Sequence, residues 1–415
     1  MADVMLAETR GVARRARTGT GAMGIAWRDA ALVWLAHEVV IAGAMAMSIQ
    51  LGVAALSLVR IGALRPPVGW WALLNVWLGW GDAGSYATIA THGYGEPKLA
   101  AFFPLLPLLE RALAPVVGGD ARVAGLVIAN VAALGAFGAV RALAERETGN
   151  RRTARLALLL VAFAPLAFGF AMGYTESLFL CLCVCAFAAM RRRSWLVAGG
   201  LATLATLTRL TGVLLVLPLA LEMGRAYGWR WPGWHAGWRP LAALALAPLA
   251  LGGFWLYLAG VYGSPLAGSN AERVFSTRAL DWPWYGPIQG VQLLLGGVDP
   301  YFTARAAFDL GALVVGAICC VALARGRTLR LPLSYAVFAW AALGLTLVTP
   351  LHPASLQAGD AQYSLPRYLA VVFPIYFVLA AWGARSRWRS LALVALSLAA
   401  CIALAFLQAT GSAIA

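Results

Sequence analysis

The chain contains eleven apolar runs, several of them close to the roughly 20 residues that an α-helix needs to cross a bilayer. They lie near residues 30–58, 122–144, 155–173, 175–190, 195–208, 212–224, 240–262, 304–324, 331–350, 367–384 and 390–411. The runs between 175 and 224 are short, and Pro218 and several glycines interrupt them. Broken helices are tolerated at membrane depth only where they face protein or a wet cavity. The pattern predicts an all-α integral membrane protein, a polytopic bundle of about eleven transmembrane helices.

The composition supports this fold class and excludes others. Hydrophobic residues make up 61% of the chain, charged residues 12%, and the mean hydropathy is +0.77. A soluble domain carries about 25% charged residues, so a soluble enzyme and a disordered chain are excluded. The net charge is +15. Its basic residues stand in short clusters between apolar runs, as topology signals do, which argues against nucleic acid as a partner.

Six basic clusters hold 22 of the 32 Lys and Arg residues, and all of these 22 are Arg. They span residues 10–28, 141–155, 191–193, 225–239, 325–330 and 385–389. If the eleven runs alternate in direction, all six clusters fall on one side, which the positive-inside rule makes the cytoplasm. We therefore predict a cytoplasmic N-terminal segment, 1–29, and one transmembrane domain, 30–415. The first apolar run is too long for a cleavable signal peptide.

The opposite, exoplasmic side receives the segments at about 59–121, 263–303 and 351–366. They are rich in acids and aromatics, some of the latter being interfacial belt residues. Examples are Trp70, Trp71, Trp77, Trp80, Trp282, Trp284, Tyr285, Asp299 and Asp360. The six cysteines all lie in apolar runs, and no ligand cluster has metal-like spacing. No metal or other cofactor is predicted, although a dependence on divalent metal stays open.

The most informative motif is Trp80-Gly-Asp-Ala-Gly-Ser-Tyr86, in the first exoplasmic segment. A carboxylate at Asp82, among Trp, Tyr and Gly beside the bilayer, is partly desolvated, which favours basic character. Gly81 and Gly84 let the backbone approach a ligand. The alternative is that Asp82 caps a short interfacial helix.

Two further candidates stand at predicted outer helix ends. Glu176, in Tyr174-Thr-Glu-Ser-Leu178, either faces a cavity or occupies the first turn of a capped helix. Arg209 lies outside every basic cluster, and an arginine at membrane depth suggests an anion-binding site. Its alternative is snorkelling to the interface.

The fourth motif, Ser364-Leu-Pro-Arg-Tyr368, places Arg367 at the start of a predicted span, near His352, Asp360 and Gln362. Alone, Arg367 reads equally well as an interfacial anchor. The predicted topology nevertheless puts Asp82, Glu176, Arg209 and Arg367 on one side. Carboxylates and two arginines beside a broken helix suit a phosphate-bearing lipid substrate, because Arg binds phosphate with fork geometry.

These motifs resemble the PIG-V family of membrane mannosyltransferases, which add the second mannose of GPI anchors and have bacterial relatives. The family order of Trp-Asp, Ile-Ala-x-His-Gly-Tyr and Ala-Phe-Phe-Pro-x-x-Pro matches residues 81–107, although Gly81 replaces the tryptophan and Thr91 an acid. The later family motifs match at Tyr174, Arg209 and Arg367. The resemblance covers roughly residues 75–385.

The resemblance implies a GT-C fold with its active site in exoplasmic loops, in a multi-pass protein of the bacterial plasma membrane. The donor would be polyprenyl- or dolichyl-phosphate mannose, and the configuration would invert. The acceptor would be a lipid-linked or cell-envelope glycan, since an Arg-rich chain fits a GC-rich bacterium that need not make GPI anchors. Asp82 would be the base, and Arg209 and Arg367 would hold the phosphate. Supporting substrate contacts would come from His92, Glu176, Tyr174 and Tyr368.

Two other classes stay open. One is a different GT-C enzyme, such as a protein O-mannosyltransferase or an arabinosyltransferase. The other is a transporter or flippase for lipid-linked sugars, although such proteins usually have repeated halves and short loops, which this chain lacks.

Overall fold

The computed structural model describes residues 2–51, 78, 81–229, 238–275, 277–296, 300–326, 328–352 and 365–409, with side chains from Gly24 onward except those of Phe275 and Tyr301. Over these ranges the chain is helical, and its one extended pairing is an isolated antiparallel bridge between Arg278 and Leu351. The all-α prediction is confirmed for this part of the chain. Some residues singled out in the sequence lie outside it, namely Trp70, Trp71, Trp77, Trp80, Asp299, Asp360, Gln362 and Ser364.

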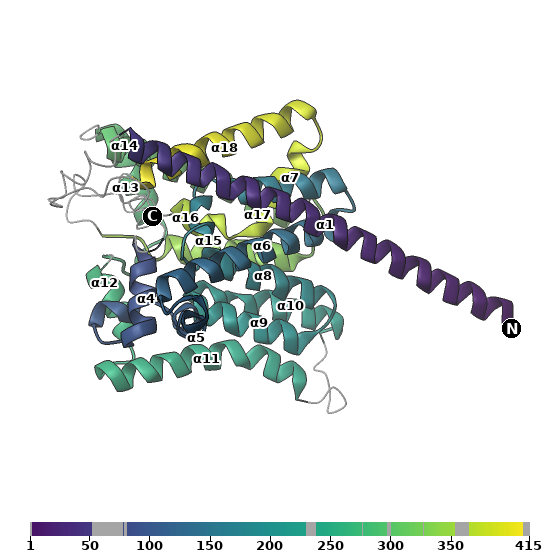
Figure 1. The fold of residues 1–415 in the computed structure, drawn as a ribbon, viewed down its shortest axis with the longest axis horizontal. Helices are drawn as coiled ribbons and strands as arrows, with labels where there is room; N and C mark the ends of the chain where they lie inside the picture. Colours follow the sequence, from purple (N-terminus) through teal and green to yellow (C-terminus); the bar gives the residue numbers. More distant parts are fainter. Residues whose placement is uncertain are drawn as a thin grey trace.

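Each of the eleven apolar runs contains a helix within the residues that the structure describes. In chain order these helices are α1 (Ala2–Gln50), α6 (Ala121–Thr148), α7 (Arg151–Ala162), α8 (Glu176–Arg191), α9 (Trp195–Thr208), α10 (Val216–Ala226), α11 (Arg239–Tyr262), α14 (Pro300–Arg325), α15 (Leu333–Leu347), the pair α16 (Leu365–Ala370) and α17 (Phe373–Gly383), and α18 (Arg387–Ala409). Most of them run roughly along one direction, and α1 extends beyond the others (Figure 1).

Five described helices are long and apolar enough to cross a membrane: α1 from Gly24, α6, α11, α14 from Phe302, and α18. Three shorter ones, α9, α15 and α17, are apolar but have only 10–17 residues. The lengths and composition fit a multi-pass membrane protein. The count of eleven spans stays a prediction, because several helices are too short to qualify by length.

The short helices between the spans belong to the segments predicted on the exoplasmic side. They are α4 (Asp82–His92), η1 (Pro97–Ala101), α5 (Leu105–Leu113), η2 (Ala114–Val117), α12 (Ala267–Phe275) and α13 (Tyr285–Gly296). In Figure 1, α4, α12 and α13 lie at the same end of the bundle, opposite the N-terminus.

Helix α8 lies at the centre of the bundle, packed against α6 and α9. Aromatic side chains join it to two later helices. The Phe187 ring centroid is 4.7 Å from that of Tyr335 in α15 and 5.1 Å from that of Phe373 in α17. All three side chains are buried. This packing fixes α8, α15 and α17 relative to one another and so holds the ends of α8 in place.

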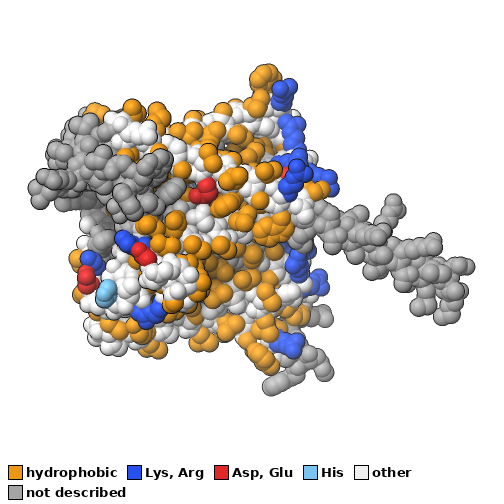
Figure 2. Space-filling view, in the orientation of Figure 1, with side chains coloured by type: hydrophobic (Ala, Val, Ile, Leu, Met, Phe, Trp, Pro, Cys, Tyr) orange, Lys and Arg blue, Asp and Glu red, His pale blue; other side chains and the backbone are white. Residues whose placement is uncertain are grey.

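The basic clusters gather at the end opposite α4. Arg146 donates a hydrogen bond of 2.9 Å to the Arg191 carbonyl, which joins the second and third clusters. Arg385 reaches the Thr328 carbonyl at 3.4 Å, which joins the last two. Figure 2 shows Lys and Arg side chains along that end and an apolar belt beside it. The described clusters therefore share one end, as predicted, and its cytoplasmic orientation stays a prediction.

Candidate active site

Four helix ends meet at the end of the bundle opposite the basic clusters. Asp82 and Glu176 are the first residues of α4 and α8, Arg209 directly follows α9, and Arg367 lies in α16. Acids at helix N-termini and a cation at a helix C-terminus complement the helix dipoles. The helix dipoles therefore favour these charges at these helix ends independently of the contacts that the side chains make with one another.

Gly81 positions Asp82. It precedes α4 with φ +63°, in the left-handed region that glycine occupies without strain. A Cβ at this position would lie 2.7 Å from the Tyr174 hydroxyl oxygen. The capping interpretation of Asp82 is not realised, because α4 has no side-chain cap hydrogen bond and the carboxylate pairs with an arginine instead.

Arg209 lies within the short, interrupted apolar runs between residues 175 and 224, where the sequence predicts broken helices. The chain ends α9 at Thr208, becomes extended at Arg209 (φ −155°), and continues as the short 3-10 helix η4 (Leu210–Leu215). Gly212 lies directly against the backbone of Ala205 and Thr206, where a Cβ would collide. This close return of the chain turns Arg209 inward rather than toward the interface.

Arg367 also lies at a helix break. Helix α16 is only six residues long, and α17 begins three residues after α16 ends. Pro366 suits the start of such a helix, because its missing N–H has no partner there. The predicted single span 367–384 is therefore two helices, and the break keeps Arg367 at the end of the bundle.

The four side chains form one ion-pair network. Arg367 donates from Nη2 to Asp82 Oδ2 and from Nε to Glu176 Oε1, both at 2.5 Å. Arg209 donates from Nη1 to the same Glu176 oxygen at 2.6 Å. Glu176 does occupy the first turn of α8, after the N-cap residue Thr175, but this cap has no side-chain hydrogen bond. Arg209 does not snorkel to the interface, because its side chain points to Glu176.

The two carboxylates differ in access. The Glu176 side chain is 1% exposed and that of Asp82 is 27% exposed, while both arginines are 13% exposed. Among the described residues, Glu176 Oε2 has no hydrogen-bond partner. Glu176 is thus placed to orient the arginines, and Asp82 is the carboxylate that a molecule from outside reaches.

Aromatic rings and a third arginine complete the cluster. The Arg367 guanidinium carbon lies 4.9 Å from the Tyr174 ring centroid. Two cations lie over the Tyr368 ring: the guanidinium carbon of Arg209 is 5.2 Å and that of Arg278 is 5.0 Å from the ring centroid. Such contacts stabilise desolvated cations. Arg278 also donates to the Thr349 carbonyl at 2.9 Å. The sequence analysis missed Arg278, although it too lies outside every basic cluster.

Tyr86 supports the arrangement from α4. Its side chain is buried, and burial raises the pKa of the hydroxyl, so Tyr86 stays neutral at physiological pH. The charges of Asp82, Arg209 and Glu176 act on this hydroxyl, so Tyr86 lies beside the network.

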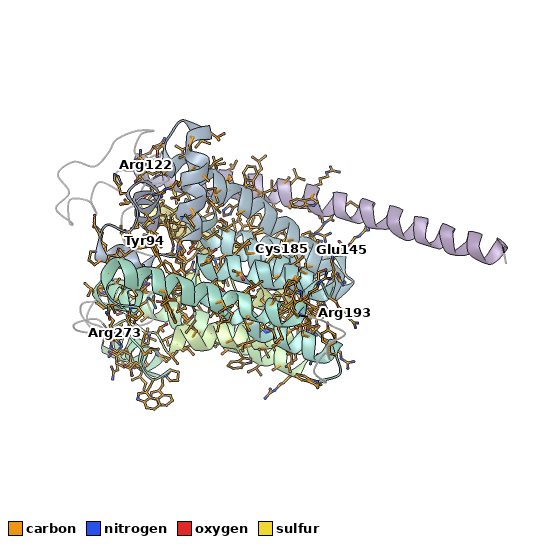
Figure 3. All side chains as sticks on the ribbon, turned by 90° about the horizontal axis from the view of Figure 1, so that it is seen from below. Tyr94, Arg122, Glu145, Cys185, Arg193 and Arg273 are labelled. Atoms are coloured by element: carbon orange, nitrogen blue, oxygen red, sulfur yellow. The ribbon has the colours of Figure 1, made fainter. Side chains whose placement is uncertain are left out.

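The structure does not bring His92 into this cluster. His92 is the last residue of α4, about 15 Å along the helix from Asp82. Its side chain is exposed, and Nδ1 lies 2.7 Å from the Thr91 hydroxyl. Figure 3 shows Tyr94, two residues further on, at the same end of the bundle as Arg122, whereas Glu145 and Arg193 lie at the other end.

The network suits an anion better than a metal ion. Within the part of the chain that the structure describes, no three His, Cys, Asp or Glu side chains come together as metal ligands do. The guanidinium groups of Arg209 and Arg367 can donate to the oxygens of an anion, which favours a ligand that carries negative charge.

One solved structure has a fold similar to that of this chain. No family model matches the sequence, and no curated protein matches it. The fold is similar to that of ArnT from Cupriavidus metallidurans bound to undecaprenyl phosphate, with a TM-score of 0.47 and 16% sequence identity. The likeness covers 82% of this chain and 74% of that one.

Proposed function

We propose that this chain is an inverting membrane glycosyltransferase of the GT-C type. It transfers a sugar, mannose by the motif resemblance, from a polyprenyl-phosphate donor to a lipid-linked or cell-envelope glycan on the exoplasmic face. The observation that carries the proposal is the single network in which Arg367 is held between Asp82 and Glu176.

The charge arrangement fits a phosphate leaving group. A glycosidase needs two carboxylates because its leaving alkoxide must be protonated. A lipid phosphate leaves as a stable anion and needs cations instead. Arg209 and Arg367 supply two such cations, and Arg278, which also lies over the Tyr368 ring, supplies a third.

The proposed step uses Asp82 as the base. The acceptor hydroxyl oxygen attacks the anomeric carbon, the bond to the phosphate oxygen breaks, and its electron pair leaves with the phosphate. Asp82 takes the hydroxyl proton. Its 27% exposure suits this role, whereas Glu176, almost fully buried and bonded to both arginines, acts as a positioning residue.

Donor binding is coupled to the release of Asp82 in this proposal. Arg367 donates a hydrogen bond to the Asp82 carboxylate. A donor phosphate competes for the same guanidinium. When Arg367 turns to the phosphate, the Asp82 oxygen is free to accept a hydrogen bond from the acceptor hydroxyl.

A transfer assay tests the proposal. Purified protein is supplied with radiolabelled polyprenyl-phosphate mannose and a glycolipid extract, and new glycosidic products are separated by chromatography. We expect labelled product with inverted configuration. Equal use of a nucleotide sugar, or passage of label across vesicles without a new glycosidic bond, would contradict the proposal. The second result would favour a transporter.

A further inference from the structure

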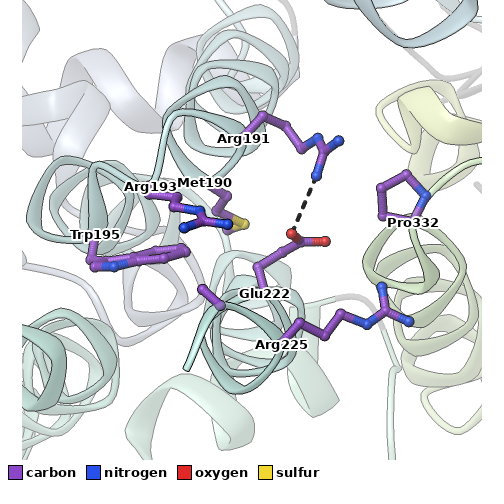
Figure 4. Close-up of a pocket in the computed structure, with 8 residues that line it drawn as sticks. Met190, Arg191, Arg193, Trp195, Glu222, Arg225 and Pro332 are labelled. Carbon is purple, nitrogen blue, oxygen red and sulfur yellow. Dashed lines mark hydrogen bonds and ion pairs between the residues drawn. The ribbon is translucent and has the colours of Figure 1, made fainter. Parts of the chain in front are cut away.

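A separate cavity of about 300 Å³ lies at the basic end of the bundle. It is lined by Met190, Arg191, Arg193, Trp195, Glu222, Arg225, Ala226 and Pro332. Helix α8 ends beside it, α10 contributes its last turn, and Pro332 precedes α15. Figure 4 shows the arginine side chains around Glu222 with Trp195 on one side and Pro332 on the other.

The lining carries an excess of positive charge, with three guanidinium groups against one carboxylate. Glu222 accepts hydrogen bonds from Ser334 at 2.6 Å and from Arg191 at 3.4 Å. Arg191 is also paired with Glu147 at 2.9 Å. Among the described residues, no acidic group lies within 4.0 Å of a nitrogen of Arg193 or Arg225. These two arginines therefore leave the cavity positive.

The backbone at Arg193 adds an independent observation. Helix α8 ends in a Schellman motif, in which the Ser194 amide donates to the Ala189 carbonyl and the Arg193 amide to the Met190 carbonyl. Arg193 occupies the left-handed position of this motif with φ +57°. Glycine is the usual residue there because it adopts this conformation without strain. An arginine at the strained position brings a guanidinium to the cavity that glycine would not supply.

We propose that this cavity binds a phosphoryl group. Arginine forks match the oxygens of a phosphate, and the volume is that of a small ligand site. Basic pockets between helices at a membrane surface bind anionic lipid headgroups. Met190, Trp195 and Pro332 provide an apolar wall beside the charges. The same chemistry would accept a lipid headgroup or a free phosphate.

The cavity is distinct from the candidate active site. Helix α8 separates them, with Glu176 at its first residue and Arg191 at its last, about 22 Å apart along the helix axis. No residue that lines the cavity belongs to the Asp82 network. The proposal therefore stands whether or not the chain transfers a sugar.

Equilibrium binding to the full-length, detergent-purified protein tests it. The probes are radiolabelled inorganic phosphate and radiolabelled short-chain phosphatidic acid, with phosphatidylcholine as the uncharged comparison. We expect Arg193→Gly and Arg225→Gln each to weaken binding at least tenfold. Arg193→Gly relieves the strained backbone, so its melting temperature should be equal to or above that of the wild type. Loss of binding in this variant then reflects the missing guanidinium.

Arg192→Gln is the matched control, because Arg192 is exposed and does not line the cavity. Its binding should be unchanged. Binding of inorganic phosphate would identify a soluble phosphate site, and binding of phosphatidic acid alone a headgroup site. Binding that is lost in Arg367→Ala but kept in Arg193→Gly belongs to the candidate active site. Wild-type affinity in both cavity variants, or no binding of either probe, would overturn the proposal.

Discussion

Arg367 donates a hydrogen bond of 2.5 Å to Asp82 across 285 residues of sequence, while its Nε holds Glu176. One guanidinium thus joins the N-termini of α4 and α8. Within this network, removing Arg367 takes away the arginine that pairs with Asp82, and removing Glu176 takes away the carboxylate that pairs with Arg209. Such losses are large in a partly desolvated site. Function and stability must therefore be measured separately for every variant of this network.

Replacing Asp82 by Asn should lower turnover by at least two orders of magnitude. The amide keeps the size of the carboxylate but cannot accept the acceptor proton, and general-base catalysis contributes about 10²–10⁴-fold. Donor binding should be retained, because Asn competes less well than Asp for Arg367. Initial rates at saturating donor, together with donor Kd, measure the two effects.

Asp120→Asn is the control for this substitution. Asp120 caps α6 and pairs with the exposed Arg122, and Asn caps a helix equally well. Turnover in this variant should match that of the wild type. Normal turnover in Asp82→Asn as well would remove Asp82 from the mechanism.

Replacing Arg209 or Arg367 by Ala should weaken binding of the lipid-phosphate donor by about 2–5 kcal/mol, since each variant removes a charge-assisted contact and leaves Glu176 less compensated. Lys should restore binding only in part, because it lacks the planar fork. Donor Kd is the measurement, with melting temperature recorded alongside. Arg122→Ala, which breaks an exposed pair, serves as the control. Unchanged Kd in both alanine variants would make these arginines structural.

The apolar runs predict the helices well, because an apolar segment of sufficient length is almost all that a helix in a bilayer requires. They predict the breaks less well. The run 367–384 contains no charge after Arg367 itself, yet the chain breaks between α16 and α17. The break between α9 and η4, in the short runs between residues 175 and 224, was visible in the sequence because Gly212 follows Arg209 closely.

The residues of the site could be predicted from the sequence, but their ion-pair partners could not. Charge counting placed Asp82, Glu176, Arg209 and Arg367 at one end, but partner choice depends on how α4, α8 and α16 pack, which no local pattern encodes. Arg278 was missed because it lies in the predicted exoplasmic segment 263–303, where the membrane-depth argument used for Arg209 does not apply. Its contact with Tyr368 depends on tertiary packing, which no local pattern encodes.

Gly81→Ala should lower turnover at least tenfold. Alanine at φ +63° is strained by about 1–2 kcal/mol, and its Cβ would lie 2.7 Å from the Tyr174 hydroxyl oxygen. Both effects displace Asp82, and small misplacements of catalytic groups are expensive. Adding Tyr174→Phe removes the clash, so the double variant should recover part of the loss. Gly95→Ala, with open space around it, is the control. Strictly additive effects of the two substitutions would rule out the clash.

Glu110 predicts a pH dependence of stability. It is buried against Gly125, and burial raises the pKa of its carboxyl to about 9 from the ordinary 4.5. The folded state therefore holds a proton that the unfolded state releases. This contribution to stability is complete below about pH 4.5 and is lost as pH rises to about 9, by up to about 1.4 kcal/mol per pH unit.

Glu110→Gln should flatten this dependence, because an amide does not titrate. Melting temperatures at pH 6 and pH 8.5 should differ less in the variant than in the wild type. Glu96→Gln, at an exposed site paired with Lys98, should leave the wild-type slope unchanged. Equal slopes in all three proteins would show that Glu110 does not titrate in this range.

The orientation of the bundle decides which substrates reach the Asp82 network. Gly95 and Ser269 lie in the segments predicted on the exoplasmic side and Ser194 at the basic end, and all three are exposed. The six native cysteines are buried or partly buried, so background labelling should be low.

Cysteines placed at positions 95 and 269 should react with a membrane-impermeant maleimide in intact cells. A cysteine at position 194 should react only after permeabilisation, because the positive-inside rule predicts that the Arg-rich end faces the cytoplasm. Labelling of position 194 without labelling of position 95 would invert the topology. Nucleotide sugars would then reach the network directly, and the lipid-phosphate donor would lose its main support.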